Sequence, residues 1–150
     1  MNILLNQEFE INNLICNSGR FSADEFQKII QDMIMKYKDY ADSSKECMIT
    51  TTRTMEIVDG KQILDVEVLL PISYRIPVEN PYKFKEKIKI TNALYTKIEQ
   101  VEKLNEAMNE VNQYIVSNGL QPITSAYIIQ SKQEDKLISE IYIGLNPNIL

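Results

Sequence analysis

Two glutamates occupy matching phrases, one in each half of the chain, and they are the first candidates for chemistry. The phrases are Leu64-Asp-Val-Glu67-Val-Leu-Leu-Pro71-Ile and Leu137-Ile-Ser-Glu140-Ile-Tyr-Ile-Gly144-Leu. A carboxylate among Leu, Ile and Tyr side chains in a partly dry groove loses hydration, so its pKa rises unless a cation or a hydrogen-bond donor compensates it. Such a carboxylate favours a ligand that is positively charged or that donates hydrogen bonds.

Three tyrosines could line the same groove. Tyr127, Tyr142 and Tyr95 would add flat apolar walls and a cation-π attraction of about 0.5 to 2 kcal/mol per contact. We therefore predict a ligand-binding set made of Glu140, Glu67, Tyr127, Tyr142 and Tyr95. The alternative is that both glutamates are solvated on an open sheet face and that the tyrosines are ordinary strand formers. Both interpretations remain open on the sequence alone.

The composition excludes several functional classes. The chain has no histidine, which removes the commonest general base and the commonest metal ligand. Its two cysteines, Cys16 and Cys47, cannot build a structural zinc cluster, and we expect both to be reduced thiols. A net charge of -5 disfavours binding to nucleic acid or to anionic membranes. We predict no metal, no cofactor and no enzymatic activity. A hydrolase that used Glu140 as a general base through a water is a further alternative.

The N-terminal residues and the apolar segments predict the compartment. The chain begins Met1-Asn-Ile-Leu-Leu, without the basic and long apolar regions of a signal peptide. The longest apolar stretch, residues 68–72, is far too short to span a bilayer. We expect a cytoplasmic protein.

Two helices are predicted, each after a capping box. Ser22-Ala-Asp-Glu25 and Thr96-Lys-Ile-Glu99 both place a hydroxyl three residues before a glutamate. Apolar residues then recur at helical spacing in each segment: Phe26, Ile29, Ile30, Met33, Ile34 and Tyr37 in the first, and Ile98, Val101, Leu104, Met108, Val111 and Ile115 in the second. The second helix should end at Asn118-Gly119, because glycine readily adopts the left-handed conformation that ends helices.

Strand patterns surround both helices. Two strands, 47–58 and 62–70, follow the first helix and are joined by Asp59-Gly60, a strong hairpin signal. Strands at 124–131 and 137–145 follow the second helix and flank a polar turn at 132–136. A leading strand precedes each helix, at about 9–17 and 82–95. Residues 71–81, with three prolines, are predicted to be a connector.

The order strand, helix, strand, strand therefore occurs twice. We predict an α+β fold in which two pseudo-symmetric β-α-β-β repeats form an antiparallel sheet, with two helices on one face and a cleft on the other. The single domain would span 1–150, with repeats at about 8–70 and 82–145. Because side chains alternate along a strand, Val66 and Val68 should face the helix, whereas Glu67 should face away. The same alternation puts Ile141 on the helix side and Glu140 on the cleft side.

The repeat and its phrases resemble the gyrase-inhibitor-like (GyrI-like) domain, the effector-binding domain of multidrug-responsive transcription activators. The residues that carry the resemblance are the two phrases around Glu67 and Glu140, the segment Tyr114-Ile-Val-Ser-Asn118-Gly119-Leu120, and Ala126-Tyr127. The resemblance implies a pseudo-symmetric sheet, two helices on one side and an aromatic cleft with an acidic residue opposite. It implies that Glu140 is the main acidic ligand contact, that Tyr127 and Tyr142 line the cleft, and that Glu67 is the pseudo-symmetric partner.

Two functions follow from these observations. The first is a stand-alone, non-catalytic module that binds a small amphipathic or cationic molecule. The second is a protein-interaction or accessory protein with a vestigial cleft, because the chain also resembles short proteins that accompany secreted toxins of Gram-positive bacteria. The expected partners are thus a small molecule or another protein, and neither nucleic acid nor a membrane.

Overall fold

The computed structural model describes residues 2–42 and 47–147, and the chain forms two compact units. One unit comprises Ile11–Ile88 and contains Glu67; the other comprises Met1–Glu10 and Lys89–Leu150 and contains Glu140. We refer to them as the Glu67 unit and the Glu140 unit. The chain passes between them within two strands, β1 (Ile3–Ser22) and β4 (Lys83–Ile98).

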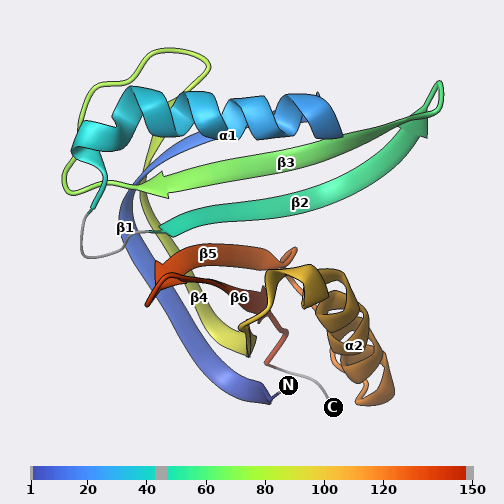
Figure 1. Cartoon of the computed structure of the whole chain (residues 1–150). Helices are drawn as coiled ribbons and strands as arrows, with labels where there is room; N and C mark the ends of the chain where they lie inside the picture. The colour runs from blue at the N-terminus through green and yellow to red at the C-terminus, as the bar shows by residue number, and fades with distance from the viewer. Residues whose placement is uncertain (1, 43–46, 148–150) are drawn as a thin grey trace. The chain divides into compact units, whose positions relative to one another are not determined.

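The Glu67 unit is a three-stranded antiparallel sheet covered by one helix. Strand β3 (Lys61–Pro71) lies between β1 and β2 (Cys47–Val58) and pairs with both. Helix α1 (Ala23–Tyr37) and the short 3-10 helix η1 (Lys38–Tyr40) follow β1, and α1 lies along one face of this sheet (Figure 1). Met33 and Tyr37 of α1 pack against Val68 and Leu70 of β3, as the alternation predicts.

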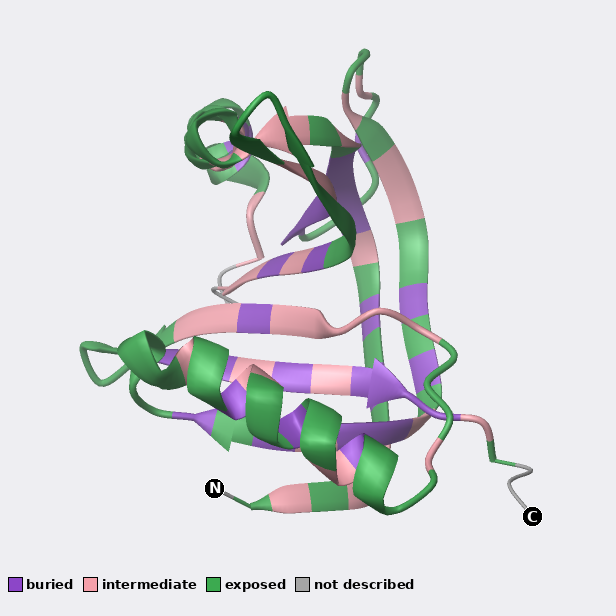
Figure 2. Cartoon of the chain, turned by 90° about the vertical axis from the view of Figure 1, so that its right-hand side faces the viewer, coloured by how far each residue is buried: buried purple, intermediate pink, exposed green. Residues whose placement is uncertain are grey.

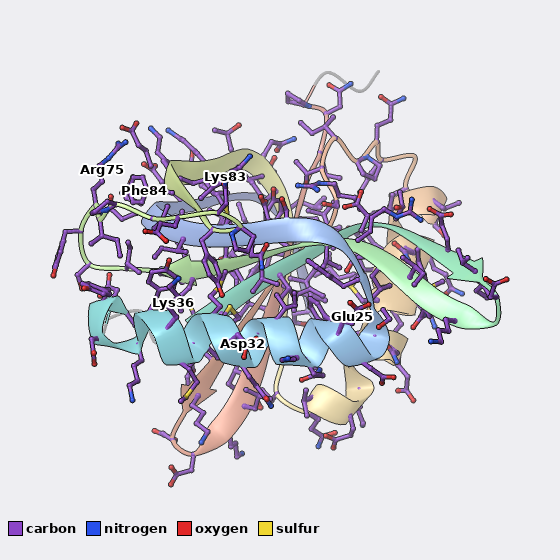
Figure 3. All side chains as sticks on the ribbon, turned by 90° about the horizontal axis from the view of Figure 1, so that it is seen from above. Glu25, Asp32, Lys36, Arg75, Lys83 and Phe84 are labelled. Carbon is purple, nitrogen blue, oxygen red and sulfur yellow. The ribbon has the colours of Figure 1, made fainter. Side chains whose placement is uncertain are left out.

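The predicted capping box begins α1. The backbone N–H of Glu25 donates to Ser22 Oγ at 3.2 Å, and the backbone N–H of Ser22 donates to Glu25 Oε1 at 3.0 Å. Figure 3 shows Glu25 at this end of the helix. The donation from the Ser22 backbone stabilises the carboxylate and lowers the pKa of Glu25.

The Glu140 unit repeats the same plan. Strand β6 (Lys136–Gly144) lies between β4 and β5 (Tyr127–Gln133), and both pairings are antiparallel. Helix α2 (Leu104–Ser117), preceded by the 3-10 helix η3 (Val101–Lys103), lies against one face of these strands with its exposed side outward (Figure 2). Its buried residues Ala107, Val111 and Ile115 contact a cluster that contains Leu94, Ile141 and Ile143.

The prediction of a second capping box was wrong. Thr96 is fully buried in β4, opposite Ile141, and its hydroxyl donates to the Asn2 carbonyl at 2.8 Å. Because β4 continues to Ile98, the helix begins only at Leu104, and no side chain caps it. The predicted end is confirmed: Gly119 follows α2 with φ of +64°.

Both hairpins turn at residues that accept positive φ. The predicted Asp59-Gly60 turn is confirmed, with φ of 51° and 77°. The second hairpin is tighter than the predicted 132–136 turn, because Glu134 and Asp135 alone form it, with φ of 51° and 64°.

Both leading strands are longer than predicted. Strand β1 extends over twenty residues, and two asparagines with positive φ, Asn6 and Asn13, lie within it. Asparagine tolerates the left-handed conformation, so the strand continues through both positions.

The pseudo-symmetry extends to individual hydrogen bonds. The N–H of Ile72, just after β3, donates to the Asn13 carbonyl at 2.9 Å, and the N–H of Leu145, just after β6, donates to the Asn92 carbonyl at 2.8 Å. In the paired registers Leu14 lies opposite Pro71, and Ala93 lies opposite Gly144. These matches place Glu67 and Glu140 at equivalent positions and confirm the α+β class with two β-α-β-β repeats. Among the described residues, no helix combines the length and apolar character needed to cross a bilayer.

Candidate functional site

Three of the predicted site residues form one row across the sheet of the Glu140 unit. Tyr95 on β4 and Tyr127 on β5 both lie opposite Tyr142 on the central strand β6. Paired residues on neighbouring antiparallel strands project from the same face, so the three rings share the face that α2 does not cover. Glu140 lies two residues before Tyr142 on β6 and therefore projects from this face as well.

The carboxylate of Glu140 is held by a hydroxyl from this row. Tyr95 Oη donates to Glu140 Oε2 at 2.6 Å, a short distance typical of a hydrogen bond to a charged acceptor. Burial, this hydrogen bond and the Glu140 charge all raise the pKa of Tyr95, so the phenol keeps its proton and remains a donor. Burial, and secondarily the charge of Glu140, also raises the pKa of Tyr142.

A fourth aromatic ring belongs to the cluster, and the sequence did not indicate it. Phe9 stacks on Tyr142 with ring centroids 4.7 Å apart and an interplanar angle of 26°, while Tyr142 lies 4.8 Å from Tyr95. Phe9 is buried, at 7% exposure. It comes from β1, far from the other rings in sequence, so only strand pairing brings it to them. We refer to Phe9, Tyr95, Tyr142 and Glu140 as the tyrosine cluster.

The surroundings of Glu140 are described for residues 2–10 and 89–147 of its unit. Lys97 lies opposite Glu140 in the β4 register, but among the described residues of this unit no lysine or arginine forms an ion pair with Glu140. Glu140 is half-buried and its one described side-chain partner is the neutral Tyr95 hydroxyl. The cluster therefore presents a negative charge beside aromatic faces, the combination that recognises organic cations.

Glu67, at the equivalent position, has different surroundings. Its side chain is 5% exposed, and its oxygens lie 3.0 Å from Lys85 Nζ and 3.7 Å from Arg53. Arg53 is shared with Asp65, at 3.4 Å. The sequence alone did not show whether a cation compensates a buried carboxylate. At Glu67 the structure shows that Lys85 and Arg53 do so.

The residues around Glu67 are aliphatic or thiol side chains, not aromatic rings. Cys16 and Ile49 lie opposite Leu69 in the register, just as Tyr95 and Tyr127 lie opposite Tyr142. Cys16 is 4% exposed, and burial followed by the charge of Glu67 raises the pKa of its thiol. The thiol is therefore a poor nucleophile at neutral pH.

A cavity of about 780 Å³ opens beside the tyrosine cluster in the same unit. Tyr95 is the residue that the cavity shares with the cluster; most of the other walls come from the end of β4, the start of β1 and the first turns of α2. Its charged lining comprises Lys97, Glu99, Lys103, Glu106 and Glu110. Three of these five are acidic, so the cavity and Glu140 have the same sign of charge. Among the described residues, no group of three or more acidic or cysteine side chains has the geometry of a metal site.

The comparisons with known proteins identify the fold. No protein-family model and no curated protein matches the sequence. Among solved structures, the EcmrR C-terminal domain superposes with a TM-score of 0.63 at 17% identity, covering 97% of this chain and 99% of that domain. EcmrR in its complex with DNA superposes with a TM-score of 0.61 at 18% identity, and the chain spans 57% of that protein's length. The chain thus has the fold of GyrI-like effector-binding domains, as the two sequence phrases implied.

Proposed function

We propose that the tyrosine cluster of the Glu140 unit binds a small cationic or amphipathic molecule and that the protein is a non-catalytic binding module. The observation that supports this most directly is the Glu140 carboxylate, which accepts a 2.6 Å hydrogen bond from Tyr95 and forms no ion pair with the described residues of its own unit. The aromatic rings of Tyr142 and Tyr95 are adjacent to it. The shared fold with effector-binding domains is consistent with this proposal.

The physical basis is the balance between desolvation and attraction. A half-buried carboxylate has lost part of its hydration, so a cation that approaches it meets less competition from water. A neighbouring aromatic face adds about 0.5 to 2 kcal/mol to the attraction for a cation, depending on desolvation. The Tyr95 hydroxyl holds the carboxylate in one orientation, which reduces the entropy lost on binding. An alkyl or aromatic portion of the ligand would cover the apolar ring faces.

The remaining parts of the proposal concern partners and compartment. The net charge of -5 supports a role without nucleic acid as a partner of this chain. Neither Cys16 nor Cys47 is in a disulfide, which is usual in a reducing compartment and supports a cytoplasmic location.

The test uses three benzyl compounds that differ in charge. Benzyltrimethylammonium, benzyl alcohol and benzoate are titrated into the protein, and binding is followed by the melting temperature and by tyrosine fluorescence. We expect the cation to bind and the anion not to bind. At a cation concentration a hundred times Kd, the free energy of unfolding should rise by about 2.7 kcal/mol.

The matched variants are Glu140→Gln and Glu67→Gln. Glutamine keeps the size of Glu140 and can accept the Tyr95 hydrogen bond but carries no charge, so this variant should lose most of its affinity for the cation. Glu67→Gln should retain it. Equal binding by Glu140→Gln and the unmodified protein would overturn the proposal, as would tighter binding of benzoate than of the cation.

A further inference from the structure

Glu67, the residue equivalent to Glu140 in the other repeat, already contacts a cation from the protein itself. Lys85, on β4 within the Glu67 unit, places Nζ 3.0 Å from both carboxylate oxygens of Glu67. A free alkylammonium ion that bound to this carboxylate would make the same contact with both oxygens. Glu140 has no such partner in the part of its own unit that the structure describes.

The burial of Glu67 explains why a cation is required there. The Glu67 side chain is 5% exposed, whereas those of Lys85 and Arg53 are 40% and 46% exposed. A buried carboxylate without a partner is strongly destabilising, whereas partly exposed cations remain hydrated without one. The ion pair therefore stabilises the buried carboxylate more than it stabilises the lysine.

The other neighbours show that Lys85 is the principal partner. Arg53 is farther from Glu67, at 3.7 Å, and it is also shared with Asp65. Lys83, labelled in Figure 3, precedes Lys85 by two residues on β4 and is exposed; no ion pair with Glu67 is described for it. The surrounding residues Cys16, Ile49 and Leu69 are buried and uncharged, so they cannot replace the lysine.

We propose that the Glu67 position is a primary-ammonium site whose resident occupant is Lys85, so that, of the two equivalent carboxylates, Glu140 is the one that remains for an external cation. The second half of this statement rests on the proposed function; the first half does not. The two repeats thus hold equivalent carboxylates, but one of them is already paired with a lysine of the same protein. Because Lys85 occupies the site at Glu67, an external cation has one of the two equivalent sites to bind, not both.

The experiment asks whether a free amine can replace the side chain of Lys85. The protein carries Glu140→Gln throughout, so that any amine effect is independent of binding at the tyrosine cluster. Adding Lys85→Ala should lower the melting temperature by about 4 to 8 °C. This shift corresponds to about 2 kcal/mol, since 1 kcal/mol shifts the melting temperature by about 2 to 4 °C in a domain of this size. Saturating n-butylammonium should recover at least half of that loss. Equal concentrations of sodium chloride or n-butanol should recover little.

Three variants in the same background keep the test decisive. Lys87→Ala, an exposed lysine on the same strand, should change the melting temperature little and should not respond to the amine. Adding Glu67→Gln to Lys85→Ala should abolish the recovery. If Lys85→Ala does not fold, Lys85→Met keeps most of the packing, and its melting temperature is compared with and without methylammonium, because the methionine leaves space only for the ammonium group. The same response to amine and to sodium chloride in a folded Lys85 variant would overturn the proposal, whereas the benzyl titration of the unmodified protein tests Glu140 separately.

Discussion

The Glu67 and Glu140 positions are equivalent in the repeat but differ in how the carboxylate is stabilised. Glu67 is nearly inaccessible and pairs with Lys85 and Arg53, among aliphatic and thiol side chains. Glu140 is half-buried, accepts a hydrogen bond from a neutral tyrosine and is adjacent to aromatic rings. The difference teaches that the repeated plan fixes the position of the carboxylate, whereas the neighbouring strands decide whether it meets cations or aromatic rings.

The largest effect should follow from removing both cations of Glu67. The double variant Arg53→Gln/Lys85→Met leaves a buried carboxylate without compensation, and breaking a buried pair in this way costs about 3 kcal/mol or more. Urea unfolding measures the loss. Glu67→Gln should cost less, because the two cations that remain are partly exposed and can be hydrated. The comparison fails if Glu67→Gln is the more destabilising of the two.

A smaller loss is expected from making the Glu140 row resemble the Glu67 row. Tyr142→Leu introduces the residue found at the equivalent position, Leu69, and removes the stacking on Phe9 and Tyr95. Each aromatic pair contributes about 0.5 to 1.5 kcal/mol beyond its buried area, so we expect a loss of about 1 to 2 kcal/mol. Tyr74→Leu is the control, because this tyrosine is 58% exposed and has a single, more distant ring contact, with Tyr40 at 6.3 Å between centroids. A loss at position 142 no larger than the control would show that the rings are not a structural cluster.

Removing one hydroxyl should have a still smaller effect. Tyr95→Phe keeps the ring and deletes the donor to Glu140, and a hydrogen bond to a charged group contributes about 1.5 to 3 kcal/mol when both groups are buried. Because Glu140 is only half-buried, we expect a loss of about 1 kcal/mol at neutral pH. Affinity for benzyltrimethylammonium should also fall, since the carboxylate is no longer oriented. Unchanged stability and affinity would contradict the role of this hydroxyl.

The same phenol predicts the dependence of stability on alkaline pH. The pKa of Tyr95 in the folded protein is raised above its ordinary value of 10.0, whereas the unfolded chain has that ordinary value. The unfolded chain thus loses this proton first, so the stabilisation is complete below pH 10 and is lost progressively as pH rises above it. Unfolding at pH 9 and pH 11 measures the loss, which should be smaller in Tyr95→Phe. Equal losses in both proteins would mean that Tyr95 ionises normally.

The smallest change in stability is expected for Glu140→Gln. The glutamine oxygen still accepts the Tyr95 hydroxyl, and substitutions without a packing or pairing defect usually stay within about 0.5 kcal/mol. Its effect on cation binding should nevertheless be the largest of any variant. This contrast between stability and affinity separates a binding carboxylate from a structural one. Destabilisation by Glu140→Gln equal to that by Glu67→Gln would remove the distinction between the two positions.

Local patterns predicted most of the elements. The bounds of β2 agree with the predicted 47–58, the Ser22 capping box begins α1, and Asp59-Gly60 forms the hairpin turn. Each of these depends on neighbouring residues alone. The capping motif at Thr96 misled because the same spacing also suits a strand, and burial of Thr96 against the helix face decided in favour of β4. Local pattern cannot weigh a hydrogen bond to the distant Asn2 carbonyl.

The site was predictable in part for the same reason. Alternation along each strand indicated Glu140 and the three tyrosines as candidates, and the structure brings Tyr95, Tyr142 and Glu140 into contact through the pairing of the non-consecutive strands β4 and β6. Phe9 could not be predicted, because β1 reaches the cluster from the opposite end of the chain. Lys85 belongs to a run in which every second residue is lysine, at positions 83, 85, 87 and 89. This pattern is typical of a solvated strand face and does not indicate a buried partner for one of the lysines.

By itself, the sequence determined which residue types occur, the repeated order of strands and helices, and the matching positions of two glutamates, because periodicity and turn chemistry act over a few residues. Only the tertiary structure decided which glutamate meets lysine and which meets tyrosine. Coulombic attraction and desolvation depend on distances through space, and residues such as Lys85 and Glu67, or Tyr95 and Glu140, become neighbours only when their strands fold together.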